Sequence, residues 1–81
     1  MSDPLILQAI AHLVPPGSHV LDLGCGDGAL LAHLQRERGC TGYGVELDDA
    51  NVAACIERNV NVLQQTVQHA LVFFTREPPY E

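Results

Sequence analysis

The chain has 81 residues, 47% of them hydrophobic, and its four arginines, ten acidic residues and lack of lysine give a formal net charge of −6. That charge repels phosphate backbones, which argues against nucleic acid as a partner. The length allows one small domain, and no apolar run approaches the roughly 20 residues that cross a bilayer, so we expect no membrane partner.

The cysteines indicate a reducing compartment. Cys25, Cys40 and Cys55 form neither a C-x-x-C pair nor an even-numbered disulfide framework. The first residues also lack the basic segment with which a signal peptide begins. We therefore expect free thiols and a cytoplasmic protein.

The first element in the chain is a predicted helix over residues 3–13. Asp3 can cap its free amide groups, Pro4 suits the first helical position, and apolar residues then recur at helical spacing. Pro15-Pro16-Gly17 makes a turn after it. The short, mostly apolar segment 19–23 is typical of a strand buried in a parallel sheet.

A glycine-rich turn follows this strand and leads into a second helix, which Gly39 can end. Asp48 or Asp49 can cap a third helix, and Asn59 can end it in the left-handed conformation. The predicted elements are helices over 3–13, 29–38 and 49–58, and strands over 19–23, 43–46, 60–63 and 70–75.

The alternation of these elements predicts an α/β fold, a three-layer Rossmann-like fragment whose helices cover the faces of a short, mainly parallel sheet. We expect a single domain over residues 1–75 and a tail over 76–81. So small a sheet leaves apolar surface and open edges. We therefore also predict a homo-oligomer, such as a homodimer formed by exchange of the C-terminal strand.

The residues between the first two strands form the pattern typical of a nucleotide site. Gly24, Gly26 and Gly28 stand where a buried strand gives way to a helix, and a turn without side chains lets the backbone approach a ligand. Glu46 lies about 20 residues further on, where a carboxylate can bind ribose hydroxyls. The competing interpretation is a merely tight turn and a solvated Glu46.

The details of the pattern favour a nucleoside with an amino-acid tail over a dinucleotide. The glycines follow G-x-G-x-G rather than G-x-G-x-x-G, and Asp27 inside the turn would repel a pyrophosphate. Asp22 could instead help to hold an ammonium group. Neither a catalytic residue nor a metal site is predicted, because the histidines lack metal-ligand spacing and Cys25 has no apparent His partner.

Two stretches resemble motifs of a known superfamily. VLDLGCGDGALLAHL is similar to the first motif of class I methyltransferases, and GYGVELD is similar to their second. The longer run PPGSHVLDLGCGDGALLAHLQRERGCTGYGVELDDANVAACIERNVNVLQ closely resembles MetW-type methionine biosynthesis proteins, and the resemblance covers about residues 4–64. It implies S-adenosylmethionine or S-adenosylhomocysteine as the cofactor and a homoserine O-acyltransferase as a partner.

The resemblance also implies a role for each site residue. Asp22 would hold the methionyl amino group, Glu46 would take both ribose hydroxyls, and Leu47 would lie against the adenine. The turn would line the methionyl and ribose part with backbone atoms. The full set of candidate cofactor-binding residues is Asp22, Gly24, Cys25, Gly26, Asp27, Gly28, Glu46 and Leu47.

The sequence departs from the family after residue 64. Gln65 and Thr66 stand where the family has a Gly-Asp pair near the adenine, and VLQQTVQ and ALVFF resemble segments that occur later in the family. The resemblance therefore implies a shortened member. Three hypotheses stay open: a cofactor-binding module, a methyltransferase whose acceptor site is completed in an oligomer, and a docking protein for the acyltransferase. Gln65, Thr66 and His69 could also reach the cofactor mouth.

Overall fold

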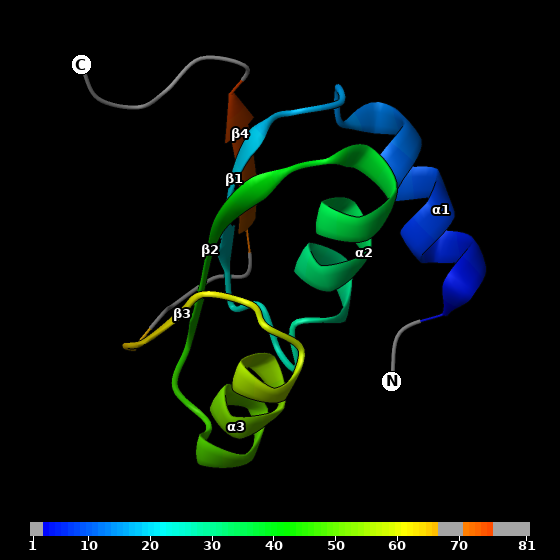
Figure 1. Ribbon diagram of the computed structural model, residues 1–81. Helices are drawn as coiled ribbons and strands as arrows, with labels where there is room; N and C mark the ends of the chain where they lie inside the picture. The colour runs from blue at the N-terminus through cyan, green and yellow to red at the C-terminus, as the bar shows by residue number, and fades with distance from the viewer. Residues whose placement is uncertain (1–2, 67–70, 76–81) are drawn as a thin grey trace.

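The computed structural model of the protein describes residues 3–66 and 71–75 (Figure 1). Its elements are α1 (Pro4–Leu13), β1 (His19–Leu23), α2 (Ala29–Arg38), β2 (Thr41–Glu46), α3 (Asp49–Glu57), β3 (Val62–Gln64) and β4 (Leu71–Thr75). All the predicted elements are present, and the observed bounds differ from the expected ones by at most two residues. The expected tail lies outside the described residues.

The predicted helix ends are confirmed. Asp3 caps α1 by accepting a hydrogen bond from the Leu5 amide at 2.8 Å. Of the two candidates for α3, it is Asp48 that caps, accepting from the Asn51 amide at 3.0 Å. Gly39 and Asn59, with φ of 62° and 60°, end their helices in the left-handed conformation.

The four strands form one sheet in the order β3-β2-β1-β4. β2 is parallel to both β1 and β3, whereas β4 runs antiparallel to β1. The expected Rossmann-like fragment with a mainly parallel sheet is confirmed. β4 departs from the parallel direction because it returns to the free edge of β1 without a crossover helix among the described residues.

One expectation was wrong: the helices do not cover both faces of the sheet. α1, α2 and α3 all lie on the same side (Figure 1). The connections β1-α2-β2 and β2-α3-β3 advance along the sheet in one direction. Right-handed crossovers that keep their direction place their helices on one face, so α2 and α3 share a side, and α1 packs against α2.

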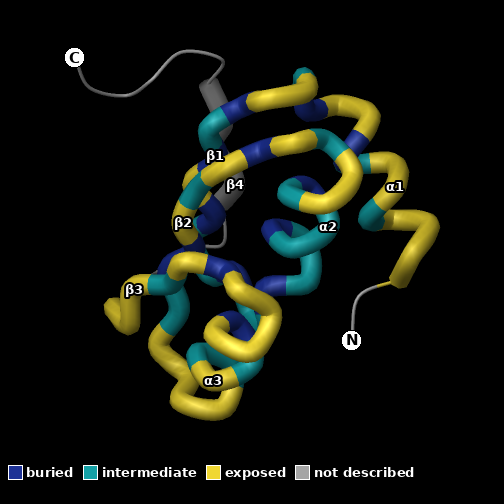
Figure 2. Tube along the Cα trace, in the orientation of Figure 1, coloured by how far each residue is buried: buried dark blue, intermediate teal, exposed yellow. Residues whose placement is uncertain are grey.

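The core lies between this helix layer and the sheet (Figure 2). Leu31 and Leu34 of α2 are almost completely buried there, beside Val20 of β1. Ser18 is also fully buried, and its hydroxyl donates to the Pro15 carbonyl at 2.6 Å. The helix layer therefore holds the carboxyl ends of β1 and β2 in fixed positions. None of the helices in the described part of the chain is long and apolar enough to span a membrane.

Candidate functional site

The glycine-rich turn between β1 and α2 has a backbone conformation that favours glycine at three positions. Gly24, Gly26 and Gly28 have φ of 77°, 60° and 82°, values that side chains disfavour. The amides of Gly24 and Cys25 both donate to the carbonyl of Val45, at 2.7 and 3.1 Å. The turn is thus anchored to the end of β2, next to Glu46.

Glu46 spans the gap between the turn and α3. Its Oε1 accepts a hydrogen bond from the Gly26 amide at 2.9 Å, and its Oε2 accepts from the Asp48 amide at 3.1 Å and from Asn51 Nδ2 at 3.4 Å. The hydrogen bond from Asp48, with smaller contributions from Gly26 and Asn51, holds the pKa of Glu46 below its ordinary value. The carboxylate is therefore ionised at neutral pH and fixed in place beside the turn.

Asp22 is a buried carboxyl group on β1, two residues before the turn, and is only 5% exposed. Burial raises its pKa to about 6, and the negative charge of Glu46 adds to the shift. Among residues 3–66 no side chain forms a salt bridge with it. A cation that bound between Asp22 and Glu46 would be attracted by both carboxylates.

Cys25 points into the protein, toward Cys55 of α3. The two sulfur atoms lie 3.7 Å apart, and a Cβ atom on Gly44 would collide with the Cys25 sulfur, while one on Gly28 would lie 2.9 Å from that of Cys55. Burial, together with the hydrogen bond to Cys55, raises the pKa of Cys25 to about 12. The thiol is therefore protonated at neutral pH, and only the backbone of Cys25 is available to line a site.

Asp27 makes contacts within the protein. Its Oδ1 accepts from the amide of Ala29, the first residue of α2, at 3.0 Å. Its Oδ2 lies 3.5 Å from Nη2 of Arg58 at the end of α3. The structure thus connects Asp27 to the frame of the turn, and this ion pair was not foreseen from the sequence.

Leu47 follows Glu46 and is exposed. Its carbonyl accepts from Nε2 of Gln64 at 2.9 Å, and the same nitrogen donates to Asp49 at 2.6 Å. Sequence reasoning missed Gln64, although its position at the end of the strand beside β2 was a usable signal. The Gln65 amide donates to the Glu46 carbonyl at 3.2 Å, which brings Gln65 to the same edge of the sheet.

The other two residues expected near the cofactor mouth are Thr66 and His69. Thr66 is exposed at the end of the described segment, and His69 lies outside the described residues. Within the described residues, no group of three or more His, Cys, Asp or Glu side chains could hold a metal ion.

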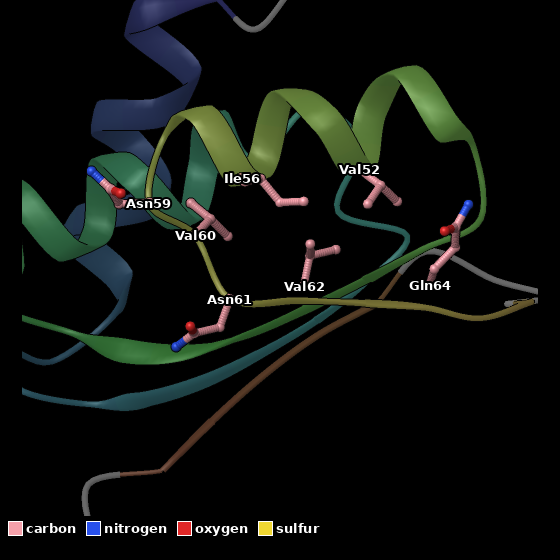
Figure 3. Close-up of a pocket in the computed structure, with 7 residues that line it drawn as sticks. All are labelled: Val52, Ile56, Asn59, Val60, Asn61, Val62 and Gln64. Atoms are coloured by element: carbon pink, nitrogen blue, oxygen red, sulfur yellow. The ribbon is translucent and has the colours of Figure 1, made fainter.

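A separate groove of about 580 Å³ lies between α3 and β3 (Figure 3). Its floor is apolar and amide side chains stand at its margin; the lining residues are Val52, Ile56, Asn59, Val60, Asn61, Val62 and Gln64. Only Gln64 is shared with the surroundings of Glu46. The groove follows the outer edge of the sheet and is distinct from the glycine-rich turn.

The chain matches the family model described as "Methionine biosynthesis protein MetW" over residues 6–78. It is 35% identical, over 83% of its length, to the bifunctional methionine biosynthesis protein MetXA/MetW of Rhodopirellula baltica. It is 30% identical, over 88% of its length, to a probable tRNA (uracil-O(2)-)-methyltransferase of Caenorhabditis elegans. The chain spans 12% of the length of each of these two relatives.

Solved structures with the same fold are S-adenosylmethionine-dependent methyltransferases. The enzyme from Geobacter sulfurreducens, crystallised in complex with S-adenosylhomocysteine, is 27% identical with a TM-score of 0.69, over 78% of this chain and 29% of that chain. A TehB-like methyltransferase from Corynebacterium glutamicum is 24% identical with a TM-score of 0.61, over 70% of this chain and 32% of that chain. The second likeness shows the fold alone.

Proposed function

The chain belongs to the MetW family of methionine biosynthesis proteins, and we propose that its glycine-rich turn and Glu46 bind S-adenosylmethionine or S-adenosylhomocysteine. The observation that carries the proposal is the contact between Glu46 Oε1 and the Gly26 amide at 2.9 Å. This contact places an ionised carboxylate beside a turn whose glycines leave the backbone without side chains. The S-adenosylhomocysteine bound to the Geobacter sulfurreducens methyltransferase supports the choice of ligand.

Each part of this ligand has a matching group in the site. Glu46 would accept hydrogen bonds from both ribose hydroxyls, one through its free acceptor site and one in place of the 3.4 Å hydrogen bond from Asn51 Nδ2. Asp22 would attract the methionyl ammonium, whose charge offsets the cost of keeping a buried carboxylate ionised. Leu47 would lie against the adenine.

The turn would contribute shape and backbone groups. Gly24, Cys25 and Gly26 would line the methionyl and ribose part with main-chain atoms, and Asp27 and Gly28 would keep the turn in its conformation. When bound, S-adenosylmethionine would supply an electrophilic methyl group. The proposal concerns binding alone and assigns no methyl acceptor.

Calorimetric titration with S-adenosylhomocysteine tests the proposal. We expect Glu46→Ala to weaken binding about 100-fold, because two hydrogen bonds to a charged acceptor are lost. Glu46→Gln, which keeps the size of the side chain, should weaken binding less. Glu57→Ala removes an exposed carboxylate at the end of α3 and serves as the matched control with unchanged affinity.

Failure to bind by wild-type protein with the circular dichroism of a folded α/β domain would refute the proposal. Equal affinities of the Glu46→Ala variant and the wild type would place the ligand elsewhere.

A docking role toward a homoserine O-acyltransferase is the second candidate. The Rhodopirellula baltica relative, whose name joins MetXA and MetW in one bifunctional protein, favours physical association with a second protein of methionine biosynthesis. Co-elution of the purified chain with such an acyltransferase would support docking, and Glu46→Ala should leave it intact. The three free cysteines support cytoplasmic residence for either role.

A further inference from the structure

One side of α3 contacts three parts of the candidate site. Its members, which we call the support stripe, are Asn51, Cys55 and Arg58. Intervals of four and three residues place side chains on the same face of a helix. The first member lies 3.4 Å from Glu46 Oε2, and the last lies 3.5 Å from Asp27 Oδ2. The middle member, Cys55, contacts the carbonyl of Gly26.

Gly26 is held from the protein side and open on the other. Its φ is 60°, and among the described residues a Cβ atom at this position would meet nothing within 4 Å. Its amide donates to Glu46 at 2.9 Å, and its carbonyl accepts from the Cys55 thiol at 3.4 Å. These hydrogen bonds hold the peptide groups before and after Gly26, the residue type with the most backbone freedom to lose.

The Cys55 thiol is well placed to donate this hydrogen bond. It is completely buried, and burial raises its pKa, so the thiol keeps its proton at neutral pH. The sulfur of Cys25 lies farther from the same carbonyl, at 3.7 Å, and 3.7 Å from the sulfur of Cys55. A thiol has one proton to donate. Cys55 therefore donates to Gly26, and its sulfur is left to accept from Cys25.

We propose that Cys55 is a positioning residue of the nucleoside site, whose thiol holds the Gly26 carbonyl and so keeps the Gly26 amide directed at Glu46 before a ligand binds. The inference rests on the proposed function of the turn and Glu46. Cys55 itself does not touch the ligand, because it is buried behind Gly26. A turn that is already held in one conformation loses less entropy when a ligand binds, so the contact acts through affinity.

Calorimetric titration with S-adenosylhomocysteine tests the role of Cys55. We expect Cys55→Ala to weaken binding about fivefold, because a weak S–H···O hydrogen bond and the order that it gives the turn are lost. Cys55→Ser keeps a donor and should retain most of the wild-type affinity. If Cys55 only filled space, serine would be no better than alanine, since its hydroxyl is costlier to bury than a methyl group.

Cys40→Ala is the matched control. Cys40 is also a buried thiol with carbonyl acceptors, the Pro15 and Arg38 oxygens at 3.9 Å, but it lies beyond the far end of α2. Its removal is the same chemical change outside the site, and the affinity should stay at the wild-type value.

Hydrogen exchange of the Gly26 amide, followed by NMR in the ligand-free protein, tests the same contact without a ligand. We expect this amide to exchange about fivefold faster in Cys55→Ala, measured relative to the amides of β1, which report any general loss of stability. Cys40→Ala should leave the ratio unchanged. A wild-type chain that does not bind S-adenosylhomocysteine would refute the proposed function, whereas equal ratios in wild type and Cys55→Ala would refute the role of Cys55.

Two other outcomes would overturn the proposal: a Cys55→Ala variant that binds as tightly as the wild type, and a Cys55→Ser variant that binds no better than Cys55→Ala. If Cys55→Ala does not fold, the S–H stretching band of the wild-type protein takes its place. Hydrogen bonding weakens the S–H bond, so the band that Cys55→Ser removes should lie at a lower frequency than that of an alkanethiol in an apolar solvent. A band at the alkanethiol frequency would contradict the contact with Gly26.

Discussion

Gly44 shows how a missing side chain shapes the candidate site. A Cβ atom at this position would collide with the sulfur of Cys25 and would lie 3.1 Å from Leu31 Cδ1. The space that Gly44 leaves open lets Cys25 point inward toward Cys55. The backbone of the glycine-rich turn can then face the site with no side chain of Cys25 in the way.

We predict that Gly44→Ala lowers the free energy of unfolding by about 2 kcal/mol, as overpacking of a core does. Cys25→Ala removes the sulfur and should return part of the loss, so the effects of the two substitutions should not add. Urea unfolding of the wild type, both single variants and the double variant measures the coupling. Strictly additive effects would show that Cys25 is not the group that Gly44 accommodates.

Asp22 is a carboxyl group whose ionisation the folded state disfavours. Its pKa is about 6 in the folded protein, against a value near 4 in an unfolded chain. The folded state therefore binds this proton more readily than the unfolded state does between pH 4 and 6. As pH rises through this window the contribution of Asp22 to stability falls, by up to about 3 kcal/mol.

We therefore predict that Asp22→Asn stabilises the protein at pH 7.5 and changes its stability little at pH 4. The difference between variant and wild type isolates Asp22 from the other carboxylates, such as Glu46, whose lowered pKa acts in the opposite direction. Thermal or urea unfolding at both pH values provides the measurement. A variant that is less stable than the wild type at pH 7.5 would contradict the assignment.

At the scale of elements, Asp48 links the start of α3 to the candidate site. Its side chain caps the helix, and its amide donates to Glu46. We predict that Asp48→Ala costs about 1 kcal/mol, the usual loss of a helix cap. Asp49→Ala should cost less than about 0.5 kcal/mol, because Asp49 makes only an exposed hydrogen bond to Gln64. If Asp49 were the cap, urea unfolding would show a larger loss of stability for Asp49→Ala than for Asp48→Ala.

The sequence predicted the bounds of an element well where residues within that element determine them. α2 was predicted with its observed bounds, because the glycines that begin and end it act through their own φ angles. β2 begins at Thr41, two residues before the predicted start, because Thr41 and Gly42 pair with His19 and Val20. The antiparallel direction of β4 likewise depends on a distant partner.

In the candidate site, too, contacts fixed by residue spacing were predicted and contacts between distant elements were not. The glycine spacing and the distance to Glu46 were sufficient to predict that the turn and the carboxylate meet, as they do through the Gly26 amide. The contact between Cys25 and Cys55 and the ion pair between Asp27 and Arg58 were not predicted. Both depend on how α3 crosses the sheet, which residue spacing does not specify.

At the scale of the whole molecule, the one-sided helix layer explains how so short a chain holds a complete turn and carboxylate pair. Residues of β1, α2, β2 and α3, with the residues that flank these elements, supply the contacts of the turn and of the Glu46 side chain, and α2 and α3 lie on the covered side. The opposite side of the sheet contributes none of these contacts.

The sheet order also has a consequence for how the chain folds. From β1 to β3, each strand pairs with the next strand in the sequence. His19 of β1, for example, pairs with Thr41 of β2, which lies 22 residues later. β4 instead returns to β1, where His19 pairs with Thr75, 56 residues later. Closing the longer loop costs only about 1 kcal/mol more, but it needs the last strand to be made. The pairing of β4 with β1 therefore closes the longest loop of the sheet, and we expect β4 to pair after β1, β2 and β3.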